Sequence, residues 1–349
     1  MIKVEYKIGK NELKEKFYEK IAIQKEYNGK TKFINSNKKI FQIEKEITKG
    51  KNKGNKIKEY IKNLNLDSIY KILNEKDSTF KEIFKNYTLK ELITVEPERI
   101  QNILNSLSEQ EKIKSIEFIF NYTDLQKDYI TPFFQEYINN QICFYCNKEF
   151  ITSFAKNEKD YCSTFQLDHF YDKGKYPYLA LSFYNLIPSC ATCNSGKVKG
   201  TKDCFKYDKL IREKSFDNET CLSPNHKNFN FENKVKFKLF LSDKCKNLDI
   251  KNKESIEIPL KENYSNEYDK YIEVFKLNER YKAHKDIVYE MITKAELYPE
   301  SRLKELQDLT GIPFQQIKKD IFNLSDEKDL SKKPFSKLIK DMSEELGLV

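Results

Sequence analysis

The sequence has no tryptophan, only three histidines and no long apolar run. A helix that crosses a membrane needs roughly 18 apolar residues in succession, so we expect no membrane partner. The first residues, Met1 to Glu5, run into charged side chains without the apolar core of a signal peptide. These absences predict a soluble cytoplasmic protein. In a reducing compartment, paired cysteines indicate metal ligands rather than disulfides.

Composition predicts a folded chain with a basic surface. Its 25 Phe and 22 Tyr bring the aromatic content to 13%, and disordered chains are poor in aromatics. A length of 349 residues suits two or three domains. The net charge of +9 is compatible with nucleic acid or another anionic partner. A chain rich in Lys, Asn and Ile is also what an AT-biased coding sequence produces, so charge alone does not decide.

Apolar spacing predicts mostly helical flanks around a central region with short strands. The helices expected before residue 141 are 11–27, 56–63, 66–73, 79–84, 97–106, 109–120 and 123–138, the last bent by Pro132. Those expected at the end of the chain are 267–281, 282–297, 301–309, 313–322 and 333–346. Alternation predicts strands at 3–7, 164–169, 234–242 and 256–260. Residues 45–58, with six lysines against one glutamate, form either a phosphate-binding loop or a solvated one.

Two Cys-x-x-Cys pairs are the most informative feature of the chain. They are Cys143 with Cys146 and Cys190 with Cys193. Each short loop lets two thiolates reach one ion about 2.3 Å away, and two loops complete a tetrahedral structural zinc site. The alternatives are a redox pair or coincidence. Cys162, Cys204, Cys221 and Cys245 have no partner at ligand spacing, and we expect mostly buried thiols there.

The segment between the cysteine pairs carries residue types that can cut a phosphodiester. Asp168 and His169 end the predicted strand 164–169, and Asn194 follows the second pair at the start of a helix expected from about Ser189 to Gly200. Cleavage needs a base that activates water and a cation for the phosphate and leaving oxygen. An imidazole suits the first task. A carboxylate and an amide oxygen suit a hard cation such as Mg²⁺.

Three short segments together resemble the HNH endonucleases, the ββα-metal or His-Me finger nucleases. The segments are Leu167-Asp168-His169, Asn185-Leu186-Ile187-Pro188-Ser189-Cys190 and Cys193-Asn194-Ser195-Gly196-Lys197. The match covers roughly residues 142–205. The resemblance implies two strands and a helix around one divalent metal, and hence an α+β fold in which a zinc-stapled ββα-metal module sits in a mostly helical chain. The expected regions are 1–140, helical and of uncertain docking role; 141–207, the nuclease module; 208–260, short strands; and 261–349, helical.

The resemblance also implies a role for each matched residue. His169 would be the general base, and Asp168 and Asn194 would hold Mg²⁺ or Mn²⁺. Asn185 would brace the loop that carries the histidine. Lys197, Lys173 and Lys175 are expected to meet phosphate, with a solvated lysine as the alternative at 197. His226 and His284 are expected to be structural.

Segments near the end of the chain, 275–281 and 333–338, are loosely similar to the tails of HNH proteins from bacterial anti-phage systems of the Septu and retron-associated types. That likeness implies a defence effector with a partner ATPase or another defence protein. The sequence therefore predicts a metal-dependent endonuclease that acts on nucleic acid, with DNA favoured over RNA. The alternative is a zinc-ribbon module that binds nucleic acid or serves as an adaptor without catalysis.

Overall fold

The structure is a computed structural model that describes residues 2–23, 28–46, 56–61, 64–107, 113–155, 161–202, 204, 221–245, 250–263, 266–324 and 330–349. Its residue contacts divide the chain into two compact units. Unit 1 comprises Met1–Glu5, Asn139–Asp168 and Ile187–Val349, and unit 2 comprises Tyr6–Ile138 and His169–Leu186. The predicted nuclease region therefore contributes residues to both units. One boundary between the units falls between Asp168, which belongs to unit 1, and His169, which belongs to unit 2.

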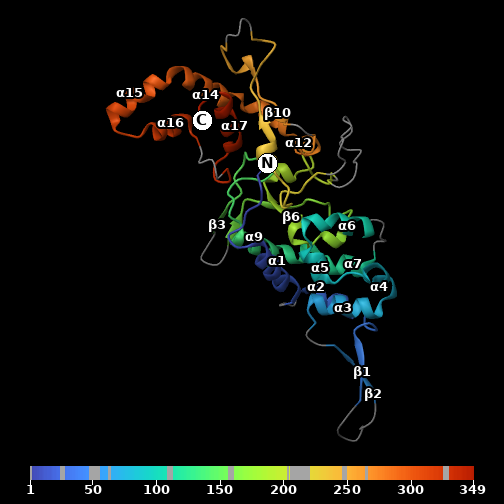
Figure 1. Cartoon of the computed structure of the whole chain (residues 1–349). Helices are drawn as coiled ribbons and strands as arrows, with labels where there is room; N and C mark the ends of the chain where they lie inside the picture. Colours follow the sequence, from blue (N-terminus) through green and yellow to red (C-terminus); the bar gives the residue numbers. More distant parts are fainter. Residues whose placement is uncertain are drawn as a thin grey trace. The chain divides into compact units, whose positions relative to one another are not determined.

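The described residues of unit 2 form short helices and an antiparallel pair of strands (Figure 1). Its elements are α1 (Lys10–Tyr18), the π-helix η1 (Glu19–Ile23), α2 (Asn28–Ser36), β1 (Gln42–Glu46), β2 (Lys56–Tyr60), α3 (Leu66–Lys76), α4 (Ser78–Phe84), α5 (Leu89–Thr94), α6 (Pro97–Leu107), α7 (Lys114–Ile119), α8 (Tyr122–Leu125), the π-helix η2 (Gln126–Ile130), α9 (Thr131–Tyr137), and the 3-10 turns η3 (Pro177–Leu179) and η4 (Phe183–Asn185).

Side-chain caps explain where several of these helices begin. The carboxylate of Asp77 accepts a hydrogen bond from the backbone N–H of Phe80 at the start of α4. At α5 the Thr88 hydroxyl accepts from the N–H of Glu91, and the Glu91 carboxylate accepts from the N–H of Thr88. Such reciprocal caps satisfy amide groups that a helix leaves unpaired at its first turn.

An aromatic core joins the segment after His169 to the helices of unit 2. Phe183 stacks on Phe134 of α9 with ring centroids 5.6 Å apart, and it contacts Phe17 of α1 at 5.5 Å. The 3-10 turn η3 also contacts α5 and α7. Each of these phenylalanines is fully buried, and burying a phenylalanine stabilises a fold by about 1.5–3 kcal/mol. The loop 169–186 is thus an integral part of the N-terminal helical core.

Unit 1 holds the remaining elements (Figure 1). They are β3 (Ser153–Ala155), β4 (Tyr161–Ser163), β5 (Gln166–His169), β6 (Leu186–Ser189), α10 (Ala191–Asn194), α11 (Phe231–Lys234), β7 (Val235–Phe237), β8 (Phe240–Leu241), η6 (Lys253–Ser255), β9 (Ile256–Glu257), β10 (Leu260–Glu262), α12 (Asp269–Val274), α13 (Leu277–Tyr281), η7 (Lys282–His284), α14 (Lys285–Leu297), α15 (Glu300–Thr310), α16 (Phe314–Phe322) and α17 (Ser336–Glu345), with the last residue of β5 and the first of β6 counted in unit 2. The strands pair two by two, as β3 with β4, β5 with β6, β7 with β10 and β8 with β9.

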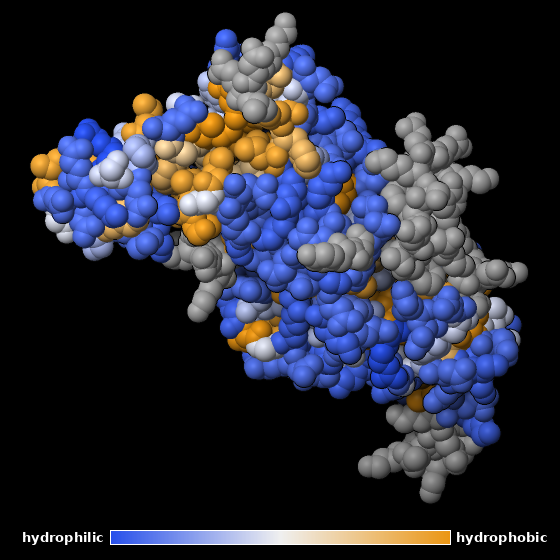
Figure 2. Space-filling view, turned by 45° about the horizontal axis from the view of Figure 1, so that its top comes forward, coloured by the Kyte–Doolittle hydropathy of each residue, from blue (hydrophilic) through white to orange (hydrophobic). Residues whose placement is uncertain are grey.

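The C-terminal helices pack on one another and leave part of their apolar surface exposed. Helix α14 contacts α16, α17 and β9. Figure 2 shows apolar side chains gathered on the face that carries these helices and the neighbouring hairpin. The exposed apolar residues of this region are Phe240, Leu241, Leu297, Leu309 and Ile312.

Most predicted helices occur, but several sequence predictions are wrong. Residues 56–63 were expected to be helical, yet Lys56–Tyr60 is a strand paired with β1. Its apolar residues Ile57 and Tyr60 are three apart, as on a helix, and a five-residue strand is too short to separate from a helix by pattern. At 3–7 only an isolated bridge at Tyr6 forms. Residues 47–55 of the basic loop lie outside the described residues.

Other predicted elements are interrupted rather than absent. The helix 123–138 divides into α8, η2 and α9, with Pro132 in the first turn of α9. The helix 267–281 divides at Lys276, whose φ of 50° is left-handed and ends α12. The strand 234–242 splits into β7 and β8, and the strand 256–260 into β9 and β10.

The architecture is α+β, about half helical with a few short strands. Among the helices of the described residues, none is both long and apolar enough to cross a membrane.

Candidate functional site

The four predicted cysteines form one buried cluster in unit 1, from a first knuckle, Cys143–Cys146, and a second knuckle, Cys190–Cys193. The sulfur atoms of Cys143, Cys146, Cys190 and Cys193 all lie within 4.8 Å of one another. Cys146 Sγ and Cys190 Sγ are 3.9 Å apart. A tetrahedral zinc ion with bonds of about 2.3 Å has sulfur–sulfur edges of about 3.8 Å. The cluster therefore has the dimensions of a structural zinc site, and the four cysteines can hold that ion.

Backbone amides around the cluster point at its sulfur atoms. The N–H of Cys190 donates to Cys143 Sγ at 3.3 Å, and the N–H of Cys193 donates to Cys190 Sγ at 3.4 Å. Cys190 is also the N-cap of α10, so the helix start and the second knuckle are the same structure. Such N–H groups favour negative charge on sulfur, as metal-bound thiolates require.

The pKa values of the thiols follow from this crowding. Burial raises the pKa of Cys143 and of Cys193 well above the ordinary value of a thiol. Burial acts in the same direction on Cys146, but hydrogen bonds from the other three cysteines lower its pKa well below the ordinary value. Cysteines bind zinc as thiolates, so a bound ion would deprotonate the whole set.

A distant arginine supplies positive charge beside the cluster. Arg280 of α13 donates from Nη1 to Cys193 Sγ at 3.1 Å, and its Nη2 lies 3.4 Å from Glu149 Oε1. Burial alone would lower the pKa of Arg280, but its electrostatic interaction with Cys193 and Cys146 raises that pKa above its usual range. Next in sequence, the hydroxyl of Tyr281 donates to the carbonyl of Cys146 at 2.6 Å. Nothing in the cysteine pattern indicates this arginine.

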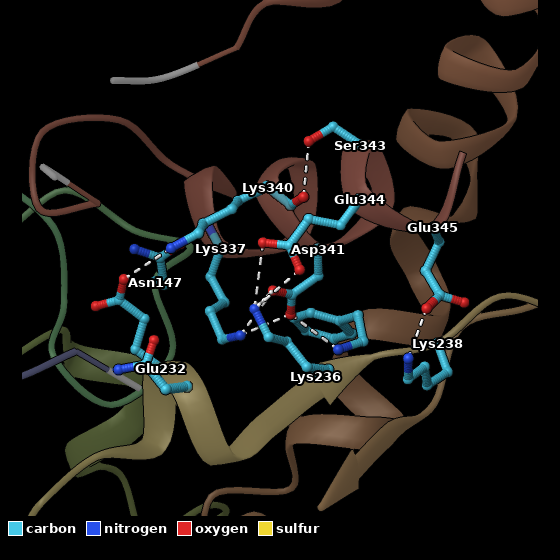
Figure 3. A network of polar contacts seen from close by, with 12 residues as sticks. Asn147, Glu232, Lys236, Lys238, Lys337, Lys340, Asp341, Ser343, Glu344 and Glu345 are labelled. Atoms are coloured by element: carbon cyan, nitrogen blue, oxygen red, sulfur yellow. Dashed lines mark hydrogen bonds and ion pairs between the residues drawn. The ribbon is translucent and has the colours of Figure 1, made fainter. Parts of the chain in front are cut away.

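The first knuckle also anchors the C-terminal helix. Asn147, with a left-handed φ of 53°, accepts through Oδ1 from Ser336 and from the N–H of Lys337. One turn on, Lys337 Nζ contacts both oxygens of Asp341 at 2.8 and 2.6 Å, and the N–H of Phe237 in β7 donates to Oδ2 of Asp341 (Figure 3). The Lys337–Asp341 pair is completely buried. Helix α17 is thereby tied to the first knuckle and to β7.

Asp168 has two buried partners, one within the first knuckle and one shortly after the second. Tyr145 OH, between the cysteines of the first knuckle, donates to Oδ2 at 2.7 Å. Lys199 Nζ lies 3.0 Å from Oδ1, and the side chains of Lys199 and Asp168 are 0% and 3% exposed. The carboxylate that was expected to bind a divalent metal therefore already holds a cationic group. Carboxylate oxygens are donors that suit a hard cation, and here one of them contacts the Lys199 ammonium.

Asn194 lies beside the strand that ends in the Asp-His pair. Its amide nitrogen donates to Gln166 Oε1 at 2.9 Å. Gln166 and Asp168 are two residues apart on β5, and residues at that spacing point to the same face of a strand. Asn194 thus contacts β5 two residues before Asp168. The oxygen of this amide is the atom that a metal would use.

The predicted helix from Ser189 to Gly200 is much shorter than expected. Ser189 ends β6, and α10 covers only Ala191–Asn194. Gly200 has a φ of +51°, and a Cβ there would meet Gly196 Cα at 2.8 Å, so a tight turn follows α10. Lys197 lies in this turn and is exposed. Lys197 therefore lies beyond the end of α10 rather than in the longer helix expected from Ser189 to Gly200.

His169 belongs to unit 2 and is held from two sides. Its Nε2 lies 3.0 Å from the carbonyl oxygen of Ala180. Because a carbonyl only accepts hydrogen bonds, Nε2 carries the proton and the lone pair of a neutral imidazole resides on Nδ1. The ring of Tyr122 in α8 stands edge-on to the imidazole, with centroids 4.5 Å apart and planes at 80°. Tyr122 comes from the N-terminal region, and no sequence motif indicated it.

Asn185 is fully buried and closes the loop that follows His169. Its Oδ1 accepts from the N–H of Tyr171 at 2.7 Å. Its Nδ2 donates to the carbonyls of Tyr171 and Leu179, both at 3.0 Å. The N–H of Phe170 also donates to the carbonyl of Asn185. One amide side chain thus fixes both ends of the loop.

The two loop lysines lie at different places. Lys173 Nζ sits 4.7 Å from the centroid of the Tyr122 ring, the ring that also touches His169. Burial lowers the pKa of Lys173, although Asp172 opposes this. Lys175 is exposed, and its N–H donates to the carbonyl of Asp172.

Two of the other cysteines approach each other, which the sequence pattern did not indicate. The N–H of Cys221 donates to the carbonyl of Cys204 at 3.0 Å, and both side chains are buried. Cys162 and Cys245 are partly exposed. His284 packs on Phe335 at 4.6 Å, and the ring of His226 accepts from the N–H of Asn228.

Comparison with protein-family models, with curated proteins and with solved structures finds no match to this chain.

Proposed function

We propose that this chain is a metal-dependent HNH endonuclease that hydrolyses phosphodiester bonds of nucleic acid, with DNA favoured over RNA. The observation that carries the proposal is the support around His169. Its Nε2–H is committed to the Ala180 carbonyl, and Asn185 clamps the loop between them. An imidazole held in one tautomer by a carbonyl is oriented as a general base. The sequence motif provides residue types that suit catalysis, and these contacts suggest what His169 and Asn185 each do.

In this proposal His169 accepts a proton from water at Nδ1. The resulting hydroxide oxygen attacks phosphorus, and the bond between phosphorus and the leaving oxygen breaks. Asp168 and Asn194 would hold Mg²⁺ or Mn²⁺, which when bound supplies positive charge for the phosphate and the leaving oxygen. Lys173, Lys175 and Lys197 would contact phosphates of the substrate, and each such contact strengthens binding at low salt.

Zinc has a structural task in this proposal. The cysteine cluster fixes Tyr145 on one side and the start of α10 on the other, and these segments position Asp168 and Asn194. A four-thiolate zinc site offers no open coordination position, so zinc itself would take no part in the reaction.

A role as an effector of anti-phage defence, with a partner ATPase or another defence protein, is the finer form of the proposal. It rests on the likeness of residues 275–281 and 333–338 to the tails of such nucleases. The alternative to catalysis is a zinc-ribbon module that binds nucleic acid or a protein partner and does not cut.

A plasmid-nicking assay with Mg²⁺ or Mn²⁺ separates these possibilities. The wild type should convert supercoiled plasmid to nicked or linear forms, and His169→Ala should not, at equal zinc content. His226→Ala is the matched control, because it removes another of the three histidines, and it should cut like the wild type. Plasmid binding without cleavage by the wild type would favour the binding module.

A further inference from the structure

The partner of Asp168 points to a property of the metal site itself. Lys199 is fully buried with its ammonium 3.0 Å from Asp168 Oδ1. Fully buried lysines are rare, and they occur when a carboxylate or another strong acceptor compensates the charge. This ion pair therefore belongs to the built structure of unit 1 and is not a chance surface contact.

The chain directs Lys199 inward by a specific turn. Its N–H donates to the carbonyl of Cys193, so the turn is fixed to the second zinc knuckle. The next residue, Gly200, has a left-handed φ and lies against Gly196 without room for a Cβ. On the other oxygen of the carboxylate, Tyr145 stacks on Phe275 with centroids 4.1 Å apart. The backbone of Lys199 and the ring of Tyr145 are thus held in place independently of the carboxylate.

As long as Lys199 contacts Asp168, the carboxylate and its neighbours carry no net negative charge that would attract a divalent cation. Asp168 and Lys199 together carry no net charge, and Asn194 and Tyr145 are neutral. Cys204, which interacts electrostatically with both Lys199 and Asp168, is a buried thiol whose pKa is raised by its hydrogen bond with Cys221 and by burial. Removing the ammonium would leave one negative charge at the site, which would attract Mg²⁺ or Mn²⁺.

We infer that Lys199 competes with the divalent cation for Asp168, and that the phosphodiester of the substrate releases the site by taking up the lysine ammonium. Metal and nucleic acid then bind cooperatively, because the phosphate brings the negative charge that the pair lacks. By linkage, nucleic acid increases metal affinity by the same factor as metal increases the affinity for nucleic acid. This inference rests on the proposed nuclease function and specifies the order in which its site is assembled.

Titration of Mn²⁺ into zinc-loaded protein, followed by the electron paramagnetic resonance of free Mn²⁺, tests the competition without measuring cleavage. Lys199→Met should bind Mn²⁺ at least ~10-fold more tightly than the wild type, a factor within the usual range of coupling between two ligands. Lys337→Met is the matched control, because it removes another fully buried lysine that pairs with an aspartate of the same unit. Its Mn²⁺ affinity should equal that of the wild type. Adding Asp168→Asn to Lys199→Met should abolish the gain.

A second measurement keeps the inference testable if Lys199→Met fails to fold or loses zinc. In the His169→Ala variant, which should not cut, a DNA duplex should tighten Mn²⁺ binding by at least ~10-fold. If Lys199→Met folds and its Mn²⁺ affinity equals that of the wild type, the competition is overturned even if the wild type cuts plasmid. If Lys199→Met does not fold, an unchanged Mn²⁺ affinity of His169→Ala on addition of duplex overturns it in the same way. If the wild type neither cuts plasmid nor binds Mn²⁺ with duplex present, the nuclease proposal itself fails.

Discussion

Arg280 provides the sharpest test of how the chain stabilises its cysteine cluster. Its Nη1 lies 3.1 Å from Cys193 Sγ and its side chain is 13% exposed. Two unit charges at this distance interact by about 5 kcal/mol at an effective dielectric constant of about 20. Part of that energy is offset because the guanidinium loses water on burial. Partners in the second coordination shell typically change metal affinity by about 10–100-fold. We therefore expect Arg280→Met to weaken zinc binding by about 1.4–2.8 kcal/mol.

Competition with a chromophoric zinc chelator measures this affinity directly. Arg280→Lys should fall between Arg280→Met and the wild type, because a lysine keeps the charge but not the planar geometry of the guanidinium. Arg302→Met is the control, since the half-exposed Arg302 pairs with Glu305 on α15. Its zinc affinity should be that of the wild type. An Arg280→Met variant that folds and binds zinc as tightly as the wild type would refute the argument that the arginine compensates the thiolate charge.

Further predictions concern the zinc, the buried ion pair and the imidazole. Metal analysis should find one zinc per chain in the wild type and none in Cys190→Ser, whose central region should unfold; an absence of zinc from the wild type would refute the cluster assignment. In urea unfolding, Asp341→Ala should lower the free energy of unfolding by about 3–5 kcal/mol, because it leaves Lys337 buried without its partner. Lys337→Met should lower it less, since Lys236 lies 3.3 Å from Asp341 and still compensates the carboxylate. Equal losses in the two variants would contradict this. Burial lowers the pKa of Lys337 to about 8, below the value of about 10.4 in an unfolded chain. The unfolded state then binds the extra proton between these values, so the stability of the wild type relative to Lys337→Met should rise from pH 8 to 10, by at most about 1.4 kcal/mol per unit; pH profiles of unfolding that run parallel would exclude it. Tyr122→Leu should slow plasmid nicking by about 10-fold through loss of the ring edge beside the imidazole, while Tyr122→Phe should retain the wild-type rate; equal rates in both variants would argue against a positioning role.

Local spacing explains how much of this structure could be predicted from the sequence. Two residues between paired cysteines leave few ways to arrange the thiols, and the cluster of four formed as expected. Helices with buried faces, such as α3 and α6, also lie within a few residues of their predicted bounds. Short elements were less predictable, since a strand such as β2 or a helix such as α10 spans too few residues to establish a period.

Partners that are distant in sequence could not be predicted in the same way. Arg280 lies 87 residues after the cysteine it contacts, and no local sequence pattern distinguishes it from the other basic residues of the chain. Tyr122, whose ring contacts that of His169, lies in the sequence before residues 142–205, the region that the resemblance covers. Lys199 was hidden because the expected helix would have continued past it, whereas a tight turn at Gly200 directs it to Asp168.

The central claim is that one zinc-stapled module assembles a cation site on Asp168 and Asn194 for a nuclease whose base is His169. Its most direct test is a crystal structure of His169→Ala with a DNA duplex and Mn²⁺, with anomalous maps recorded at the zinc and manganese absorption edges. We expect a zinc peak among the four cysteine sulfur atoms and a manganese peak on the Asp168 carboxylate and the Asn194 amide, with Lys199 moved to a phosphate. A map without manganese at Asp168, with Lys199 still on the carboxylate and duplex bound, would contradict it.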